Sequence, residues 1–478
     1  MGTLDIGAEI EGFRVLERLH VGGMAVLYRV DPPKDPGFPV IMKIPRLEQG
    51  EDSVSVVSYE VEQMMLAAMR GPHVPRLVAA GDMAKQPFLA MEYIEGASLH
   101  DWALKAPLAA AEVVRLMVPV ASAVHQIHCQ QFVHLDLKPA NVIYRTNGEA
   151  VLIDLGLGHH AHLPDLLAEE FRKPVGSAPY MAPEQVAGVR CDPRSDIFAL
   201  GVIMYELATG ELPFGAPSTA SGLRQRLYRA PTPPRARCPD LPEWLQEIIL
   251  RCLEVDARHR YSTAAQLALD LGHSDQVVIT ERGRRLKGQG ALTLFKRWLR
   301  AAGWEPTPCP APAEQIVAAP IVMVAVATQY DQPAQAAALQ AAVKRIASMD
   351  ADYRIAVVTV VKPYPLLGSS QPAESAGAQH IRYLVQLKHW AMPLGLPPDR
   401  LTHHVIESNE PADALLHYAR LNHADQIVIG APPMVGAPER GVAYKPLPGT
   451  VASRVMLEAP CTVTLVRPRH PEDSDSAP

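Results

Sequence analysis

Apolar and polar positions follow different periods in the two parts of the chain. Residues 13–19, 25–30 and 40–44 are short runs rich in apolar and β-branched side chains, and a glycine-containing turn separates the first two. Runs of this kind are typical of strands. Residues 54–69 instead repeat apolar side chains at helical spacing, and residues 110–130 form a long apolar segment of the same type. The first part therefore combines a small sheet with helices, as in α+β folds.

The second part, from residue 317 to residue 467, alternates apolar strand-like runs with longer amphipathic segments. The expected strands are 320–328, 353–361, 401–407, 426–430 and 462–466, and the expected helices are 333–349, 376–392, 411–422 and 449–458. Strands that alternate with helices predict a parallel, doubly wound α/β sheet with a ligand crevice at the carboxyl ends of its strands.

Between these parts, residues 273–316 are basic and then proline-rich. The basic side chains stand among apolar ones and are Arg282, Arg284, Arg285, Lys287, Lys296, Arg297 and Arg300. An amphipathic helix is expected over residues 291–302. It either docks on a neighbouring lobe or makes weak peripheral contact with an anionic membrane, and docking is favoured because one short helix without a lipid anchor binds membranes weakly. The prolines from Pro306 to Pro312 then form a semi-rigid linker, and residues 468–478 are expected to be a disordered tail.

Composition narrows the class of protein. The 478 residues are 48% hydrophobic and 20% charged, with a formal net charge of -6, so a soluble chain of several domains is expected, without nucleic-acid binding. The six cysteines form no C-x-x-C pair, so structural disulfides and a zinc site are not expected. The N-terminus does not resemble a signal peptide, and no apolar run reaches the ~18 residues of a membrane span. A cytoplasmic protein is therefore expected.

The candidate chemistry begins in residues 134–141. Asp136 stands two positions before Lys138 and five before Asn141, and Asp154 follows thirteen positions after Asn141. Phosphoryl transfer needs a carboxylate to orient the attacking hydroxyl, a cation beside the moving phosphoryl group, and oxygen ligands for Mg²⁺. Asp136 and Lys138 are therefore catalytic candidates, and Asn141 and Asp154 are candidate ligands of Mg²⁺, or of Mn²⁺ in its place.

This string and Asp154-Leu155-Gly156 resemble the catalytic loop and the metal-binding motif of bacterial eukaryotic-like Ser/Thr protein kinases. The resemblance covers roughly residues 13–271. It implies ATP as cofactor and a bilobal α+β kinase domain over residues 12–272, with an N-lobe over about 12–91 and a C-lobe over about 95–272.

The same resemblance implies a nucleotide site between the lobes. It assigns nucleotide contacts to Gly22, Gly23, Leu27, Lys43, Glu62, Met91, Glu92, Ile94 and Ile143. Lys43 would contact the phosphates and pair with Glu62. Glu60 is the alternative partner, although it is offset from Glu62 by about 200° around a helix. Met91 would gate the adenine pocket, whereas the backbones of Glu92 and Ile94 would bond the adenine edge.

On the substrate side, Ser177 stands at the position where Ser/Thr kinases have a hydroxyl that contacts the catalytic Asp and Lys. Glu184, in Ala182-Pro183-Glu184, is expected to form a buried pair with Arg260. Asp196 is expected to bond the backbone of the catalytic loop. This complete stretch favours protein substrates over the small molecules that aminoglycoside-type kinases phosphorylate.

Two features of the activation loop, residues 157–176, predict how the enzyme is controlled. Kinases of this family usually have an Arg before the catalytic Asp that binds a phosphate on this loop, and here that residue is Leu135. No Ser, Thr or Tyr stands between Leu157 and Gly176. With no phosphate to add, no Arg is needed to bind it. Activity is therefore expected not to depend on activation-loop phosphorylation.

The second part resembles the universal stress protein family in the run 426–430, in Gly449-Thr450 and in Ala459-Pro460-Cys461. Some members bind ATP, and the matching residues here are Gly430, Gly436, Gly449 and Thr450. Pro433 replaces a usual glycine, and Ala327-Thr328 stand where an aspartate is usual. The domain over residues 317–467 would therefore bind a ligand, form a homodimer or dock substrates.

The leading hypothesis is a soluble Ser/Thr protein kinase with a C-terminal sensing, dimerisation or docking domain. The alternative is a pseudokinase scaffold that binds nucleotide weakly. Its basis is that His20 and Ala25 replace two glycines of the phosphate-binding loop and that Ile41 narrows the adenine pocket. Against it, Lys43 and the other catalytic residues are all present.

Overall fold

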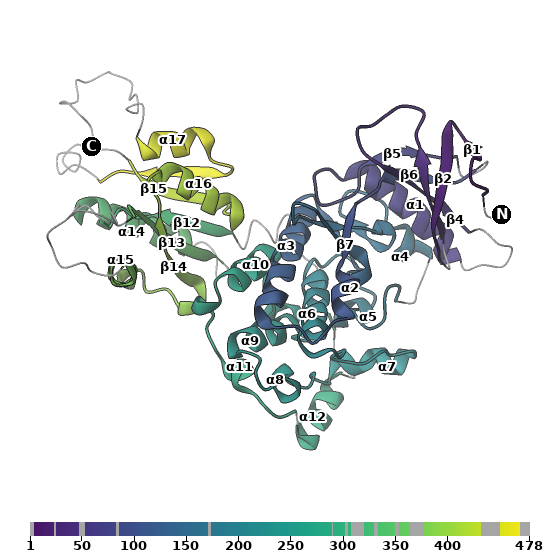
Figure 1. Cartoon of the computed structure of the whole chain (residues 1–478). Helices are drawn as coiled ribbons and strands as arrows, with labels where there is room; N and C mark the ends of the chain where they lie inside the picture. The colour runs from purple at the N-terminus through teal and green to yellow at the C-terminus, as the bar shows by residue number, and fades with distance from the viewer. Residues whose placement is uncertain are drawn as a thin grey trace, which may run out of the picture. The chain divides into compact units, whose positions relative to one another are not determined.

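The structure is a computed structural model that divides the chain into two compact units (Figure 1). It describes residues 4–22, 25–46, 53–82, 86–170, 174–288, 290–301, 305–306, 320–328, 333–348, 353–363, 376–431 and 450–468. The first unit is Met1–Ser274 with Ile279–Ile316, and the second is Asp275–Val278 with Val317–Pro478. Gly23, Gly436, Gly449, the prolines from Pro308 to Pro312 and nearly all of the expected tail lie outside the described residues.

The first unit begins with a six-stranded sheet whose order is β1-β2-β3-β4-β6-β5. Its strands are β1 (Glu9–Ile10), β2 (Phe13–Val21), β3 (Ala25–Asp31), β4 (Val40–Pro45), β5 (Leu77–Ala80) and β6 (Leu89–Glu92). One face buries a cluster that includes Phe13, Tyr28, Met42 and Phe88. The helix α1 (Ser53–Ala68) also packs on this sheet. The four-residue edge strand β5 was not among the expected strands.

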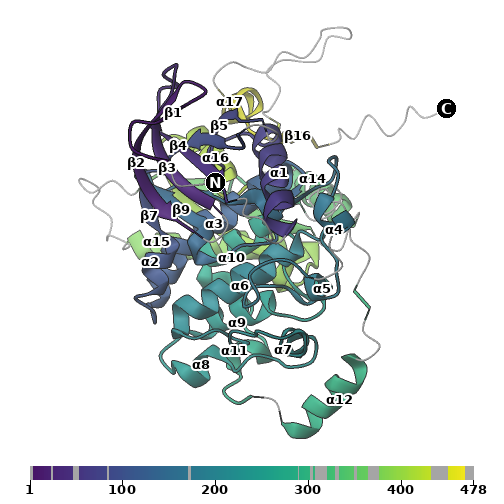
Figure 2. The ribbon, with the colours of Figure 1, turned by 90° about the vertical axis from the view of Figure 1, so that its right-hand side faces the viewer.

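The remainder of the first unit is mainly helical. Its helices are α2 (Leu99–Ala103), α3 (Ala110–Cys129), α4 (Leu166–Glu170), α5 (Pro183–Val186), α6 (Arg194–Thr209), α7 (Ala220–Arg224), α8 (Pro234–Arg237), α9 (Glu243–Cys252), α10 (Ala264–Gly272), α11 (Glu281–Arg284) and α12 (Ala291–Ala301). The nearly wholly buried α6 lies between α3 and α9 (Figure 2). A Cβ on Gly201 would lie 2.6 Å from the Cβ of Cys252, so glycine allows α6 and α9 to approach closely.

Short strands carry the loops between these helices. β7 (Gly96–Ser98), β9 (Val142–Arg145) and β10 (Ala150–Leu152) form one sheet, and β8 (Phe132–Val133) pairs with β11 (His159–His160). Residues 134–141 leave β8 and enter β9, and Asp154 follows β10. The hairpin of β9 and β10 therefore brings Asn141 and Asp154 to the same end of that sheet.

The basic segment differs in part from its expected linker role. Arg282 on α11 pairs with Glu247 on α9 at 2.8 Å, so this part of the segment belongs to the helical lobe. On α12, Phe295, Trp298 and Leu299 are each more than half exposed. The prediction that the lobe itself covers this apolar face is therefore wrong for these three side chains.

The second unit is a parallel five-stranded sheet with the order β14-β13-β12-β15-β16. Its elements in chain order are β12 (Ile321–Ala325), α14 (Pro333–Ala347), β13 (Arg354–Val361), α15 (Ala376–Ala391), β14 (Leu401–Glu407), α16 (Pro411–Leu421), β15 (Gln426–Gly430), α17 (Val451–Glu458) and β16 (Thr462–Val466). Apolar residues of α14 and α15 pack on one face and those of α16 and α17 on the other. The expected doubly wound α/β fold is confirmed, and strand order reverses between β12 and β15.

Two expectations from composition have different outcomes. In the part of the chain that the structure describes, no helix combines the length and apolarity needed to span a bilayer. Cys191, however, is disulfide-bonded, so the expectation that this chain carries no structural disulfide is wrong. Cys238, Cys252 and Cys461 are free thiols.

Candidate active site

A cavity of about 1360 Å³ in the first unit collects most of the predicted site residues. Those that line it are Gly22, Leu27, Lys43, Glu62, Met91, Glu92, Ile94, Asp136, Lys138, Asn141, Ile143, Asp154 and Ser177. His20, Ala25 and Ile41, which depart from the kinase pattern, line the same cavity. Apolar side chains from β3, β4 and β9 and from the segment after β6 therefore surround one end, and charged side chains surround the other.

Lys43 lies between two carboxylates at the charged end. Its Nζ is 2.6 Å from Oε2 of Glu62 on α1 and 3.0 Å from Oδ1 of Asp154. Burial alone would lower the pKa of Lys43, but the two carboxylates outweigh burial and raise this pKa above its ordinary value. Lys43 in turn lowers the pKa of Asp154. The lysine therefore stays protonated and can attract phosphate.

The approach of α1 to Asp154 depends on Gly156. A Cβ at this position would lie 2.4 Å from Oγ and 2.7 Å from the carbonyl oxygen of Ser58 on α1. Any side chain would push α1 outward and draw Glu62 away from Lys43. Asp154 itself has φ 63° and ψ 63°, a left-handed conformation that is uncommon for a residue with a side chain and is often found at functional sites.

Asp136 and Lys138 form a second polar group beside the first. Oδ2 of Asp136 lies 2.8 Å from Nζ of Lys138, which is also 3.0 Å from Oγ of Ser177. The backbone N–H of Ser177 donates to Oδ1 of Asp136 at 2.6 Å. Nδ2 of Asn141 donates to the carbonyl oxygen of Asp136 at 2.9 Å. The arrangement brings a carboxylate, a cation and the Ser177 hydroxyl together at the cavity.

Asp196 holds the backbone of the catalytic loop, residues 134–141, through hydrogen bonds. Its Oδ2 accepts the backbone N–H of His134 at 2.8 Å, and its Oδ1 accepts that of Leu135 at 2.9 Å. His128 on α3 lies 2.9 Å from Oδ2, and all of these groups are buried. The sequence gives no sign of this contact of His128, because a histidine within an apolar helix has no local signature of such a role.

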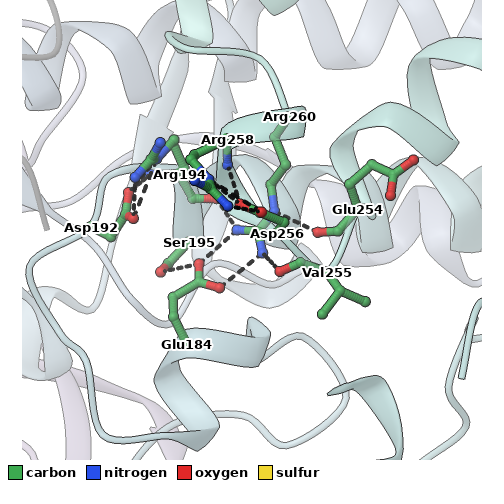
Figure 3. Close-up of polar contacts among 9 residues, drawn as sticks. All are labelled: Glu184, Asp192, Arg194, Ser195, Glu254, Val255, Asp256, Arg258 and Arg260. Carbon is green, nitrogen blue, oxygen red and sulfur yellow. Dashed lines mark hydrogen bonds and ion pairs between the residues drawn. The ribbon is translucent and has the colours of Figure 1, made fainter. Parts of the chain in front are cut away.

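Glu184 and Arg260 form the expected buried contact (Figure 3). The guanidinium donates to both oxygens of the carboxylate, at 2.6 Å and 2.8 Å, and Ser195 donates to Oε1 at 2.7 Å. Burial alone would raise the pKa of Glu184, but Arg260 and the hydrogen bonds lower it. The pair joins the segment after Ser177 to the turn before α10.

Arg226 holds the substrate-side segment and was missed by sequence analysis. It is completely buried and donates to the carbonyl oxygens of Met181 and, at 2.8 Å, Ala178. Burial lowers its pKa to about 10. Nearby, the hydroxyl of Tyr180 donates to Glu206 at 2.7 Å. These contacts join residues that are 26 to 48 positions apart, so no short sequence motif predicts them.

Glu92, which lines the cavity, uses its side chain and its backbone N–H for contacts within the protein. The carboxylate pairs with Arg76 at 3.0 Å and with Arg145 on β9 at 2.6 Å. The backbone N–H donates to the carbonyl oxygen of Arg76. A contact of Glu92 with the adenine edge would therefore use its carbonyl oxygen.

In the second unit, a cavity of about 920 Å³ lies at the carboxyl ends of the strands. Gly430 and Thr450 line it together with Thr328, Lys362 and Trp390. A Cβ on Gly430 would lie 2.6 Å from Nε2 of Gln335, which donates to Val466. Thr450 caps α17 through a hydrogen bond from the N–H of Ser453. Two of the four residues proposed for a nucleotide thus face one crevice.

Comparisons with known proteins agree with this division. Residues 13–270 match the protein kinase domain family, and residues 321–467 match the universal stress protein family. "Serine/threonine-protein kinase Pkn1" of Myxococcus xanthus is 32% identical over 295 residues, which are 60% of this chain and 42% of that protein. "Serine/threonine-protein kinase PrkC" of Bacillus subtilis is 30% identical over 272 residues, 56% of this chain and 41% of that protein. The chain thus spans about two fifths of the length of these curated relatives.

Proposed function

The chain belongs to the protein kinase family and carries a C-terminal universal stress protein domain, and from this membership we propose that it phosphorylates Ser and Thr residues of proteins with ATP. One observation carries the proposal: the pair Lys43–Glu62 and the group Asp136–Lys138–Ser177 face the same cavity, with Asp154 beside Lys43. A kinase domain uses ATP and a divalent metal ion.

The metal ligands proposed are Asn141 and Asp154, for Mg²⁺ or Mn²⁺. Nδ2 of Asn141 is held by Asp136, which leaves its Oδ1 as an oxygen ligand. One carboxylate oxygen of Asp154 faces Lys43. The side chain of Asp154 is 42% exposed and lines the cavity. Hard cations prefer such oxygen donors. When bound, the metal ion would neutralise charge on the phosphates of ATP.

The protein residues contribute positioning and charge. Asp136 accepts a hydrogen bond from the substrate hydroxyl and aims its oxygen at the γ-phosphoryl group. Lys138 stabilises negative charge on that group, and Lys43 holds the α- and β-phosphates. Because these groups are held in place before substrate binds, catalysis rests on orientation and electrostatic stabilisation and needs no covalent enzyme intermediate.

A phosphotransfer assay distinguishes this enzyme from a pseudokinase scaffold. Full-length protein is incubated with radiolabelled ATP, Mg²⁺ and a generic basic protein, with the Asp136→Asn variant as reference. We expect label on Ser or Thr of the acceptor, and removal of divalent metal by EDTA should abolish it. Wild-type protein no more active than Asp136→Asn would favour the scaffold, whose basis is the altered phosphate loop with His20 and Ala25.

We further propose that activity does not depend on a phosphate in the activation loop. The loop lacks hydroxyl side chains between Leu157 and Gly176, and Leu135 replaces the phosphate-binding Arg. In the same assay, phosphatase-treated wild type should therefore keep its activity. A required phosphate on Ser177 or Tyr180, found by mass spectrometry of the active enzyme, would contradict the proposal.

The C-terminal domain is proposed to sense a ligand, dimerise or dock substrates. The crevice beside Gly430 and Thr450 supports a ligand, and nucleotide binding there remains a prediction that also involves Gly436 and Gly449. Counting nucleotides bound per full-length chain tests it, since two per chain would support a second site and one would oppose it. The location of the protein in the cytoplasm also remains a prediction.

A peripheral membrane contact is proposed for α12. Phe295 and Trp298 stack with ring centroids 6.1 Å apart on an exposed face, and residues 283–301 contain six basic side chains and no acidic one. Basic amphipathic helices of this type bind anionic lipid surfaces. We expect sedimentation with phosphatidylglycerol vesicles, weakened by salt and by Phe295→Ser/Trp298→Ser but not by Ile381→Ser on α15. Equal binding to phosphatidylcholine vesicles would contradict an electrostatic contact. No binding to either kind of vesicle would refute the proposed membrane contact of α12.

A further inference from the structure

We propose that Asp165 and Arg190 form a permanent ion pair that holds the activation loop in its active position, so that a built-in carboxylate takes the role of a loop phosphate. The proposal rests on the kinase function proposed above and extends it from the absence of a phosphosite to the device that replaces one. Neither residue belongs to the motifs that carry the family resemblance.

Asp165 and Arg190 form a short and largely buried ion pair. Nε of Arg190 lies 2.9 Å from Oδ2 and 3.1 Å from Oδ1 of Asp165. Nδ1 of His159 lies 3.4 Å from Oδ2. The three side chains are 14 to 19% exposed. An ion pair shielded to this degree is screened less by solvent and salt than an exposed surface pair.

Arg190 also binds the beginning of the loop. Its second terminal nitrogen donates to the carbonyl oxygen of Leu157 at 3.0 Å and to that of Gly158 at 3.4 Å. Arg190 itself lies beyond the other end of the loop, between α5 and α6. One guanidinium therefore ties the start and the middle of the activation loop to the helical lobe, which the planar, forked donor set of arginine allows and a lysine does not.

Asp165 also contacts α4. Its Oδ1 accepts the backbone N–H of Ala168 at 3.1 Å, which orders the first turn of this short helix. Leu167 on α4 is buried, and α4 packs against α1, which carries Glu62. The contacts thus run without a break from Arg190 through Asp165 and α4 to the helix that pairs with Lys43.

The charge of Asp165 is suited to a permanent contact. Burial alone would raise the pKa of Asp165, but His159, Arg190 and the N–H of Ala168 lower it to about 2. The carboxylate therefore stays ionised at any physiological pH. Leu135 offers no competing cation at the catalytic loop, since its apolar side chain is buried there. A phosphate can be removed, whereas this carboxylate cannot, so control of the enzyme must act elsewhere.

The experiment compares the full-length Asp165→Asn, Arg190→Lys and Asp165→Glu variants with wild type. Asp165→Asn preserves the shape of the side chain but removes its negative charge. Arg190→Lys preserves the positive charge but removes the forked donor groups of the guanidinium. We expect both to lower kcat by about 10- to 100-fold, the effect of losing a charge-assisted hydrogen bond, and Asp165→Glu to retain more activity. Hydrogen exchange should accelerate in residues 157–170 and in α1. Asp31→Asn removes an exposed pair with Arg14 and should change neither readout.

The outcomes separate this inference from the proposed function. Wild-type protein that transfers no phosphate would refute the kinase function, whatever the variants do to exchange. An active wild type with unchanged kcat in Asp165→Asn would overturn the ion-pair proposal, even if exchange accelerates, because the pair would then be only structural. A lowered kcat with faster exchange in the loop and α1 supports it.

Discussion

Asp136→Asn is expected to lower kcat by about 10²- to 10⁴-fold, the contribution of a positioned general base or hydroxyl-orienting carboxylate. Asparagine has almost the same size but presents one amide N–H₂ group where the carboxylate presents only acceptors. The group would face either Lys138 Nζ or the N–H of Ser177, both donors that now contact Asp136 at 2.8 Å and 2.6 Å. The substitution breaks one of these two contacts, and the side chain at position 136 then no longer orients the substrate hydroxyl.

Nucleotide binding should be nearly unchanged in this variant. The apolar end of the cavity, with Met91, Ile94 and Ile143, does not involve Asp136. Steady-state kinetics with radiolabelled ATP and a fluorescent-nucleotide titration measure the two effects separately. Ser177→Ala is the comparison variant: it removes one 3.0 Å contact to Lys138 but leaves the carboxylate in place, so kcat should fall less than in Asp136→Asn. Wild-type kcat in Asp136→Asn would exclude Asp136 from catalysis.

The residues that could be predicted lie in short recognisable strings, even where the two partners of a contact are far apart in the sequence, as Glu184 and Arg260 are. Asp136, Lys138 and Asn141 lie within six positions, and Asp154 follows a recognisable apolar strand. Their spacing predicts a common site, and the hairpin of β9 and β10 is what brings Asn141 and Asp154 together in the structure. The alternation of residues 317–467 likewise predicts its sheet, and the signal is clearest at the centre, where β12 is a continuous apolar run that is buried on both faces and β13 is nearly so.

The residues that were missed act across long separations. Arg226 contacts carbonyl oxygens 45 and 48 positions away, and Arg190 pairs with an aspartate 25 positions away. An arginine in a sequence looks like a surface charge until the fold shows what it contacts. Arg282 illustrates the same limit, because in the sequence it is one of a basic run, whereas the folded lobe pairs it with Glu247.

The second large effect is expected at Arg260. Its five N–H donors are all used: two bind Glu184, and three bind the carbonyl oxygens of Arg194, Glu254 and Val255 (Figure 3). Arg260→Met would leave the Glu184 carboxylate buried without its cation. Removing one partner of a buried pair costs about 3–5 kcal/mol, so the free energy of unfolding should fall by this amount. Denaturant titration of the full-length protein, followed by circular dichroism, measures the change.

Three comparisons make this prediction specific. Arg258→Met, two residues away, removes a largely exposed contact with Asp256 and should leave stability nearly unchanged. Glu184→Gln/Arg260→Met removes the orphaned charge and should recover part of the loss, but not all, because the three carbonyl oxygens remain unpaired. The deficit of Arg260→Met should also shrink as pH falls, because without Arg260 burial raises the pKa of Glu184 and the folded protein then binds a proton more tightly than the unfolded chain. A double variant as unstable as Arg260→Met would mean that the lost hydrogen bonds, and not the orphaned charge, determine the effect.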